Sequence, residues 1–343
     1  MGTKKIKVVF FSRKQRSLGN FSVESYFENI RQNLPQQFEA VNVVMPYESN
    51  GILKRIFNAF YCISKQGDIN HVTGDIHYVA TFLKKSKTVL TILDCGMLHF
   101  SKGLKHKILK LFWFTIPIKN AEVITAISSA TKKDILYYTG CLESKIKVVY
   151  VCVNELFQRK EKVFNASYPI ILQIGTAPNK NLNRLIPALK GVSCKLIIIG
   201  KLPEETITLL NEFSIDYELI DSKISDHEIA GYYEQSDIVS FVSTLEGFGM
   251  PIIEANAVGR VVIAGDNSSM PEIGGNGAHF VDAFNIAAIH EGVKRIISDS
   301  IYSEKLIQNG FKNKERFNAE NLAMEYANIY NSLLLNNSHN NEN

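Results

Sequence analysis

The stretch Asp237–Gly259, DIVSFVSTLEGFGMPIIEANAVG, contains an apolar run, a turn with two glycines and a helical segment in direct succession. The apolar run predicts a buried strand, because it is rich in β-branched and aromatic residues. Gly247 and Gly249 allow backbone conformations that bring amide groups close to a ligand, and Pro251 suits the first position of the following helix. A strand that turns into a helix is the building unit of a parallel α/β sheet.

The start of this helix predicts a binding site for an anion. Free backbone N–H groups and the helix dipole attract a pyrophosphate or another charged leaving group. Two carboxylates flank the turn, Glu246 in the loop and Glu254 early in the helix. Carboxylates accept strong hydrogen bonds from sugar hydroxyls. We therefore expect a ligand that combines phosphate and sugar.

The same alternation of strands and helices runs through the chain in two blocks. Strands are expected at 5–12, 40–44, 68–73, 88–93, 122–127 and 145–150, and again at 170–174, 195–200, 217–220, 237–242 and 260–264. Amphipathic helices are expected at 23–34 and 129–138, and Ser225 with Glu228 forms a capping box. Residues 151–168 lose the alternation, which indicates a linker.

The length of the chain, 343 residues, exceeds the roughly 250–300 residues at which a single hydrophobic core stops growing. We therefore predict two doubly wound α/β domains with parallel sheets, at 1–160 and 161–318. A C-terminal helix at 319–335 and a disordered tail at 336–343 are expected to follow.

The composition narrows the class of protein. Hydrophobic residues make up 45% of the chain and charged residues 21%, which is typical of a globular protein. The five cysteines are widely spaced and form no CxxC pair, so neither a disulfide framework nor a zinc site is expected, and a cytoplasmic location fits. No apolar stretch reaches the roughly 20 residues of a membrane span.

Three segments outside the opening stretch add to its pattern and together resemble a known family. EGFGMPIIEA (246–255) with SSMPEIGG (268–275) resembles the glutamate-x7-glutamate signature of the family-4 retaining glycosyltransferases, glycosyl transferases group 1. IGTAPNKNLNRLIPAL (174–189) is similar to the donor-phosphate loop of that family, and ITAISSATKKDI (124–135) to a segment of its first domain. The resemblance implies the GT-B fold, in which two Rossmann-like domains face a cleft. The first would bind the acceptor and the second a nucleotide-diphosphate-sugar donor.

The resemblance also implies roles for individual residues. Glu254 would bind the ribose of the nucleotide, Glu246 the donor sugar, and Lys180 the diphosphate. Asp94, in the turn after the fourth strand, would be a further catalytic residue. Other donor contacts are expected from Gly175, Thr176, Asn179, Gly247, Phe248, Gly249, Met250 and Gly19.

Three positions depart from the family pattern. Asn179 stands where the phosphate loop usually has an arginine, so one positive charge is missing. Leu93 stands where the family often has a histidine beside the donor sugar; His99 could substitute for it, although a loop histidine is more often merely exposed. The turn after the first strand holds Gly19 alone instead of a pair of glycines.

The implied reaction is a retaining transfer of a hexose to a cell-surface glycan or a lipid-linked saccharide, in which the departing phosphate oxygen helps to take the acceptor proton. The sequence contains no Asp-x-Asp motif and no cluster with metal-ligand spacing, so no metal or other cofactor is expected. Protein groups would then have to neutralise the negative charge of the leaving diphosphate.

Charge is divided unevenly along the chain. Residues 1–160 carry 24 Lys and Arg against 11 Asp and Glu, whereas 161–343 carry 14 against 23. Either the basic half meets an anionic partner, or its lysines are scattered and solvated. Within it, 102–119 (KGLKHKILKLFWFTIPIK) combines lysines with Trp113 and Phe114. This segment is either an interfacial helix on the inner face of a membrane or a helix that packs on its own sheet.

Two other classes of protein remain open at this point. A nucleotide-sugar epimerase or phosphorylase could share the architecture, and a donor-binding protein without catalytic activity could result from the loss of the histidine at Leu93. A nucleic-acid partner is not expected, because it would explain the basic half but not the paired glutamates. Release of nucleoside diphosphate from the donor distinguishes an enzyme from a binder.

Overall fold

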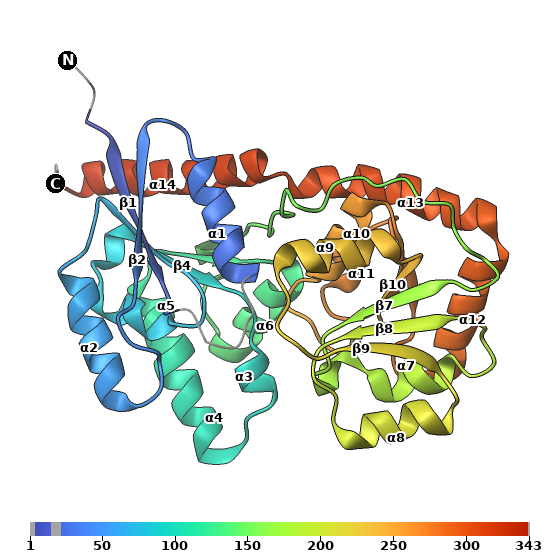
Figure 1. Ribbon diagram of the computed structural model, residues 1–343. Coiled ribbons are helices and arrows are strands. Elements are labelled where there is room, and N and C mark those ends of the chain that lie inside the picture. Colours follow the sequence, from blue (N-terminus) through green and yellow to red (C-terminus); the bar gives the residue numbers. More distant parts are fainter. Residues whose placement is uncertain (1–3, 15–21, 342–343) are drawn as a thin grey trace. The chain divides into compact units, whose positions relative to one another are not determined.

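The computed structural model describes residues 4–14 and 22–341 and divides the chain into two compact units (Figure 1). The first domain comprises 1–152 together with 319–343, and the second domain comprises 153–318. Each domain has its own parallel sheet and its own hydrophobic core.

The first domain is built on six parallel strands in the order β2-β1-β3-β4-β5-β6. They are β1 (Ile6–Ser12), β2 (Phe38–Val44), β3 (Ile69–Val72), β4 (Thr88–Ile92), β5 (Val123–Ala126) and β6 (Ile146–Val148). Every residue of β3 and β4 is buried, as expected for a sheet covered on both faces. The strand order reverses between β1 and β3, where ligands bind in open α/β sheets.

Helices cover both faces of this sheet. They are α1 (Ser22–Gln32), α2 (Ile52–Ile63), α3 (Gly96–His99), α4 (Gly103–Leu109), the π-helical turn η3 (Lys110–Thr115), α5 (Ile116–Asn120) and α6 (Ser129–Thr139), with short 3-10 turns η1 (His77–Phe82), η2 (Lys85–Lys87) and η4 (Glu143–Lys145). Helix α6 begins and ends at residues that are typical of helix termini. The Ser128 side chain accepts from the Thr131 amide at its start, and Gly140 ends it in the left-handed conformation.

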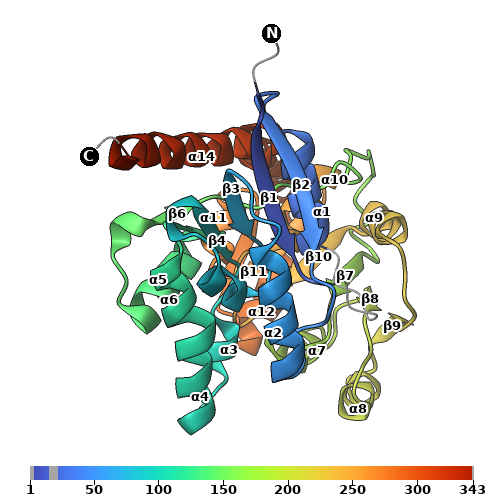
Figure 2. The same cartoon turned by 90° about the vertical axis from the view of Figure 1, so that its left-hand side faces the viewer.

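The closing helix α14 (Ala319–Asn341) belongs to the first domain, where it lies beside α1 (Figures 1 and 2). Its Tyr326 hydroxyl is 2.9 Å from that of Tyr26, and its Tyr330 hydroxyl is 2.7 Å from Nδ1 of His71 on β3. The other ring nitrogen of His71 is 2.7 Å from Oγ1 of Thr91. Burial lowers the pKa of His71 to about 3, so this histidine is neutral and structural.

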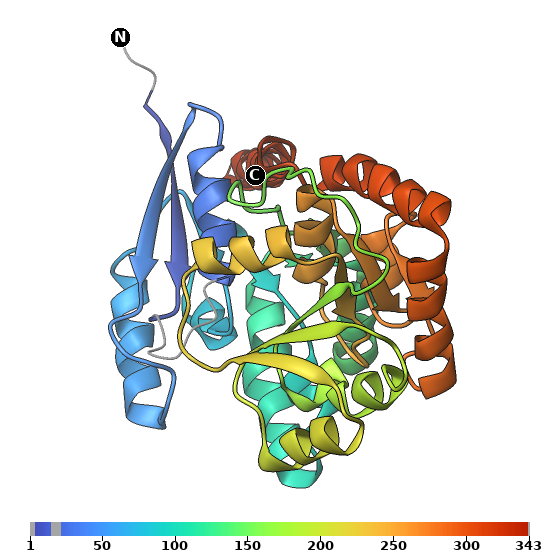
Figure 3. The same cartoon turned by 45° about the vertical axis from the view of Figure 1, so that its right-hand side comes forward.

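The second domain has six parallel strands in the order β12-β11-β10-β7-β8-β9. They are β7 (Ile170–Ile174), β8 (Lys195–Ile199), β9 (Asp216–Ile220), β10 (Ile238–Phe241), β11 (Val261–Gly265) and β12 (His279–Val281). The helical elements are η5 (Pro178–Lys180), α7 (Leu182–Ala188), α8 (Glu204–Glu212), α9 (Asp226–Gln235), α10 (Met250–Val258), α11 (Met270–Gly274), α12 (Ile286–Ser298), α13 (Ser300–Lys314) and η6 (Glu315–Phe317). Helices lie on both faces of the sheet (Figures 1 and 3).

The predicted strands, the two domains and the capping box of Ser225 and Glu228 are present in the structure. The domain boundary differs, because it falls at Val153 instead of at 161. The amide of Val153 donates to the Phe317 carbonyl at 3.1 Å, and Phe157 is buried against Tyr233, so the start of the predicted linker packs on the second domain. The tail expected at 336–343 is helical as far as Asn341. Strand β12, which is three residues long, was not predicted.

Candidate active site

Two predicted ligand loops meet in the second domain. The strand order reverses between β10 and β7, and the loops that follow these neighbouring strands are 175–181 and 242–249. The Thr244 amide donates to the Asn179 carbonyl at 2.8 Å, and Nδ2 of Asn179 donates to the Leu245 carbonyl at 3.0 Å. Both loops therefore form one surface at the carboxyl ends of the strands, where open α/β sheets bind ligands.

The charged pair at this surface is Lys180 and Glu246. Their side chains are 19% and 15% exposed, and Nζ of Lys180 lies 2.6 Å from Oε1 of Glu246. Nδ2 of Asn179 donates to the same oxygen at 3.2 Å, and the ammonium group lies 4.7 Å from the centre of the Phe241 ring. An incoming anion would compete with Glu246 for Lys180. The carboxylate would then be free to accept hydrogen bonds from a hydroxyl-bearing ligand.

Two serines hold the loop that carries Glu246. The Glu246 amide donates to Oγ of Ser268 at 3.1 Å, and this hydroxyl donates to the Glu246 carbonyl at 2.6 Å. The Ser269 hydroxyl also donates to that carbonyl, at 3.1 Å, and to the carbonyl of Phe248. Ser268 has φ 58, a conformation that is unfavourable for a residue other than glycine and that persists where surrounding contacts fix it. These contacts tie the loop to the start of α11.

The turn into α10 depends on Gly249. Its φ is 131, and an added Cβ would lie 3.2 Å from the Ile252 side chain, so the position favours glycine. Met250 opens the helix, with Pro251 in its first turn. The Phe248 side chain is buried and meets the Phe317 ring edge-on at 5.7 Å, which leaves its backbone as the part able to face a ligand.

Glu254 lies in α10 and accepts a hydrogen bond from the Tyr233 hydroxyl at 2.5 Å. Desolvation by burial raises the pKa of Glu254 to about 7, and the Tyr233 hydrogen bond partly opposes this shift. A carboxyl group with a pKa near neutrality changes its charge state readily when a ligand arrives. Groups of this kind concentrate at functional sites.

The remaining predicted site residues lie in two places. In the second domain, Gly175 has φ 83 next to the Lys180 side chain, and the Thr176 hydroxyl donates to the Lys201 carbonyl at 2.7 Å. In the first domain, Asp94 follows β4 and accepts from the Gly96 amide at 2.7 Å. Gly19 lies outside the residues that the structure describes.

His99, the suggested substitute for the missing histidine, is held in place by two partners in the first domain. Its Nε2 lies 2.9 Å from Oδ2 of Asp134, and its Nδ1 lies 3.1 Å from the Tyr138 hydroxyl. Both ring nitrogens of His99 are therefore engaged within its own domain.

Sequence reasoning missed Tyr233 and the role of the two serines. Tyr233 lies on α9, and no local pattern links it to Glu254. Ser268 and Ser269 could have been found, because they begin a segment that the resemblance itself includes. Two buried oxygens next to these loops, Ser243 Oγ and Asn267 Oδ1, have no hydrogen-bond partner among the described residues. Such atoms indicate places where a ligand or a water molecule completes the bonding.

Residues 4–14 and 22–341 contain no group of three or more histidine, cysteine, aspartate or glutamate side chains arranged to hold a metal ion. None of the helices there combines the length and the apolar character needed to cross a membrane.

Comparison with known proteins identifies the family of the second domain. Residues 154–313 match the family model described as Glycosyl transferases group 1. The chain is 26% identical over 230 residues to the O-antigen chain mannosyltransferase RfbU of Salmonella typhimurium, which covers 64% of this chain and 63% of that protein. It is 24% identical over 284 residues to the capsular polysaccharide biosynthesis glycosyltransferase CapM of Staphylococcus aureus, with 76% and 74% covered.

The fold has solved counterparts. The crystal structure of Anabaena HepE in complex with UDP and glucose matches with a TM-score of 0.78 at 14% identity, over 96% of this chain and 100% of that one. Two doubly wound domains with parallel six-stranded sheets, together with this structural match, show the GT-B fold. The family match over the second domain and the curated relatives support a group 1 glycosyltransferase.

Proposed function

We propose that this protein is a retaining, metal-independent glycosyltransferase that moves a hexose from a nucleotide-diphosphate-sugar to a saccharide or lipid-linked acceptor. The observation that carries this proposal is the pair of Lys180 and Glu246 beside the start of α10. It combines a cation for a diphosphate, a carboxylate for sugar hydroxyls and the N-terminal end of a helix on one surface.

The donor would contact the second domain through its diphosphate, its ribose and its hexose. Its diphosphate takes Lys180 from Glu246, and the amides at the start of α10 complete the phosphate site. Glu254, held by Tyr233, accepts hydrogen bonds from the ribose hydroxyls. The released Glu246 accepts hydrogen bonds from the hexose. Mannosyltransferases among the relatives and the HepE complex with UDP and glucose support a hexose as the transferred group.

The proposed transfer forms one bond and breaks one. The acceptor hydroxyl attacks the anomeric carbon on the face from which the diphosphate departs, so configuration is retained. The bond between the anomeric carbon and the phosphate oxygen breaks with its electron pair moving to the diphosphate, and this oxygen takes the hydroxyl proton. Lys180 stabilises the growing negative charge, which is greater in the transition state than in the bound donor.

The acceptor would bind to the first domain. Support comes from the basic balance of residues 1–160, which suits a phosphate-linked acceptor. The relatives RfbU and CapM are described as acting in O-antigen and capsular polysaccharide synthesis. We propose by extension that this protein builds a cell-surface glycan in the cytoplasm, with acceptors presented at the inner face of the membrane.

Thermal stability with nucleoside diphosphates and their sugars tests donor binding, because a ligand that binds only the folded state stabilises it. Release of nucleoside diphosphate without acceptor then tests catalysis. Lys180→Gln should abolish this release, whereas Lys201→Gln, which changes an exposed lysine close to the loop, should leave it intact. Glu246→Gln should reduce release while free nucleotide still binds.

Three outcomes would decide against parts of the proposal. Stabilisation by a donor without any release of nucleoside diphosphate would favour a donor-binding protein, in line with Leu93 at the position of the family histidine. Loss of activity in chelator, with recovery on adding magnesium or manganese, would overturn metal independence. Inversion at the anomeric carbon, measured by NMR of the product, would overturn retention.

A further inference from the structure

Helix α2 presents its large apolar side chains to solvent. Its buried residues are Asn58, Ala59 and Cys62, which are small or polar. Asn58 ties the helix to the preceding loop through both the amide and the carbonyl of Tyr47. The most exposed of its apolar residues are Ile52, Leu53, Ile56, Phe57 and Phe60, which are 45% to 74% exposed. Four of them recur at the spacing of one helix face, so α2 carries an exposed apolar stripe.

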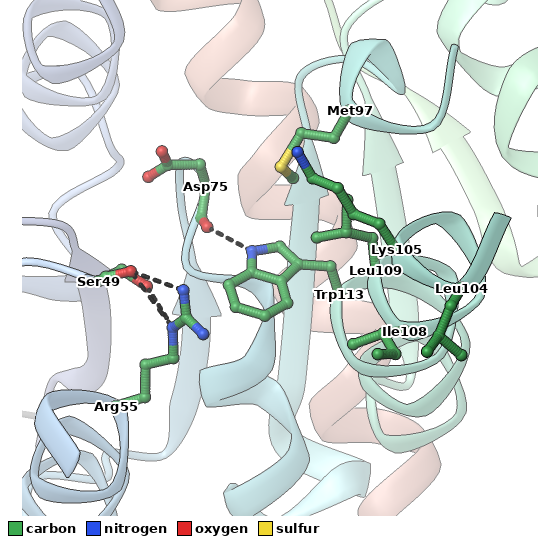
Figure 4. A pocket seen from close by; sticks show the side chains of 9 residues that line it. All are labelled: Ser49, Arg55, Asp75, Met97, Leu104, Lys105, Ile108, Leu109 and Trp113. Carbon is green, nitrogen blue, oxygen red and sulfur yellow. Dashed lines mark hydrogen bonds between the residues drawn. The ribbon is translucent and has the colours of Figure 1, made fainter. Parts of the chain in front are cut away.

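Helix α4 and the turn η3 continue this surface. Leu104, Ile108, Leu111 and Phe112 are 44% to 74% exposed. A cavity of about 530 Å³ separates them from α2, with Arg55 on one wall and Lys105 on the other (Figure 4). Figure 2 shows α2 and α4 at the end of the first domain opposite α14. The apolar faces of α2 and α4 thus lie at the same end of this domain, and the recess between the two helices is lined by Arg55, Lys105 and Asp75.

Trp113 and Phe114 do not contribute to this surface. Both are buried, and the Trp113 ring donates from Nε1 to the Asp75 carbonyl at 3.1 Å. The Arg55 guanidinium lies 4.4 Å from the centre of the same ring. These two aromatic residues therefore anchor the segment 102–119 to the first domain and leave its exposed contacts to Leu104, Ile108 and the lysines.

The two segments that carry these apolar residues have charged side chains of one sign. Residues 51–66 and 95–121 contain no aspartate or glutamate. Their basic residues are Lys54, Arg55, Lys65, Lys102, Lys105, Lys107, Lys110 and Lys119. An anionic lipid bilayer matches both properties, because apolar side chains enter the acyl region while lysines remain at the phosphate groups. A nucleic acid would match only the charge, and a second copy would bring two cationic faces together.

We propose that α2 and α4 form an interfacial surface that docks the first domain on an anionic lipid bilayer. Leu53, Phe57 and Phe60 enter the membrane, and the lysines of α4 contact the lipid phosphates. This inference does not require the proposed activity. The residues that enter the membrane are thus those of α2, and not Trp113 and Phe114 of segment 102–119.

The test is co-sedimentation of the full chain with vesicles of phosphatidylcholine, with and without phosphatidylglycerol. We expect binding to the anionic vesicles that weakens as salt rises, and little binding to phosphatidylcholine alone. The double substitution of Phe57→Ser and Phe60→Ser should reduce binding by at least about tenfold. Each of Lys105→Gln and Lys107→Gln should reduce it by about fivefold. The control is Val163→Ser with Ile301→Ser, which removes two even more exposed apolar residues from the second domain and should bind normally.

Circular dichroism and donor-induced thermal stabilisation show whether each variant is folded, and the second readout reports the donor site separately from the membrane. Failure of wild-type protein to bind anionic vesicles at low salt would overturn the proposal. Equal binding by the double phenylalanine variant would do the same. A concentration-dependent dimer that this variant loses, with no vesicle binding, would assign the surface to a second copy instead.

Discussion

Replacement of Glu254 by glutamine should stabilise the second domain at neutral pH while weakening its donor binding. Burial raises the pKa of this carboxyl from 4.5 to about 7. Because the folded-state pKa lies above the unfolded value, the stability that Glu254 contributes is complete below pH 4.5 and is lost as the pH rises through 7. The shift corresponds to about 3 kcal/mol. Glu254 keeps some contact with solvent, which screens its charge, so we expect a stability difference of about 2 kcal/mol.

Glutamine keeps the shape of the side chain and can still accept from the Tyr233 hydroxyl, but it carries no charge to desolvate. The assay is the unfolding free energy of both proteins at a series of pH values from 4 to 8. The difference between them at each pH isolates Glu254, because every other titrating group is common to both. We expect this difference to be small at pH 4 and to reach about 2 kcal/mol in favour of Glu254→Gln at pH 8.

The same substitution should weaken nucleotide binding although it raises stability. Loss of a charged acceptor for the ribose hydroxyls should weaken nucleotide binding at pH 8 by about tenfold or more, measured by calorimetry. Tyr233→Phe should raise the pKa of Glu254 further, because the hydroxyl that opposes the shift is gone. A stability difference that stays flat from pH 4 to 8 would refute this reasoning, as would a glutamine variant less stable than wild type at pH 8.

Three further predictions follow from contacts described above. Lys180→Gln should lower turnover more than donor affinity, because its charge opposes one that grows in the transition state; an increase in KM alone would contradict this. Gly259→Val should destabilise the second domain by about 2–4 kcal/mol in urea unfolding, because φ is 84 and a Cβ would meet the Phe311 ring at 2.6 Å. Truncation before Ala319 should expose the aromatic core of the first domain, detected as a loss of protection in hydrogen exchange, while the second domain stays protected.

Most of the fold could be predicted from local patterns in the sequence. Short β-branched runs predicted eleven of the strands, because a strand buried on both faces must be apolar throughout. The spacing of Glu246 and Glu254 around two glycines also predicted a ligand surface at a turn between a strand and a helix. Both inferences rely on residues that are neighbours in sequence.

Contacts over long separations could not be predicted in this way. The hydrogen bond of Tyr233 to Glu254 joins two helices, and nothing in either helix specifies the other. The periodicity of 319–335 indicates that one face is buried but not against which domain. For α2, apolar residues occupy both faces, so the pattern cannot tell that Ala59 and Cys62 face the core while Phe57 and Phe60 face solvent.

The return of α14 to the first domain sets an order for folding during synthesis. Tyr326 and Tyr330 complete a core that begins with Phe10 and His71, so this core must wait for the last helix to leave the ribosome. The second domain is continuous from Val153 to Asn318 and is released before that helix. It can therefore fold while the first sheet is still incomplete, and the half of the protein that is translated first is the half that finishes last.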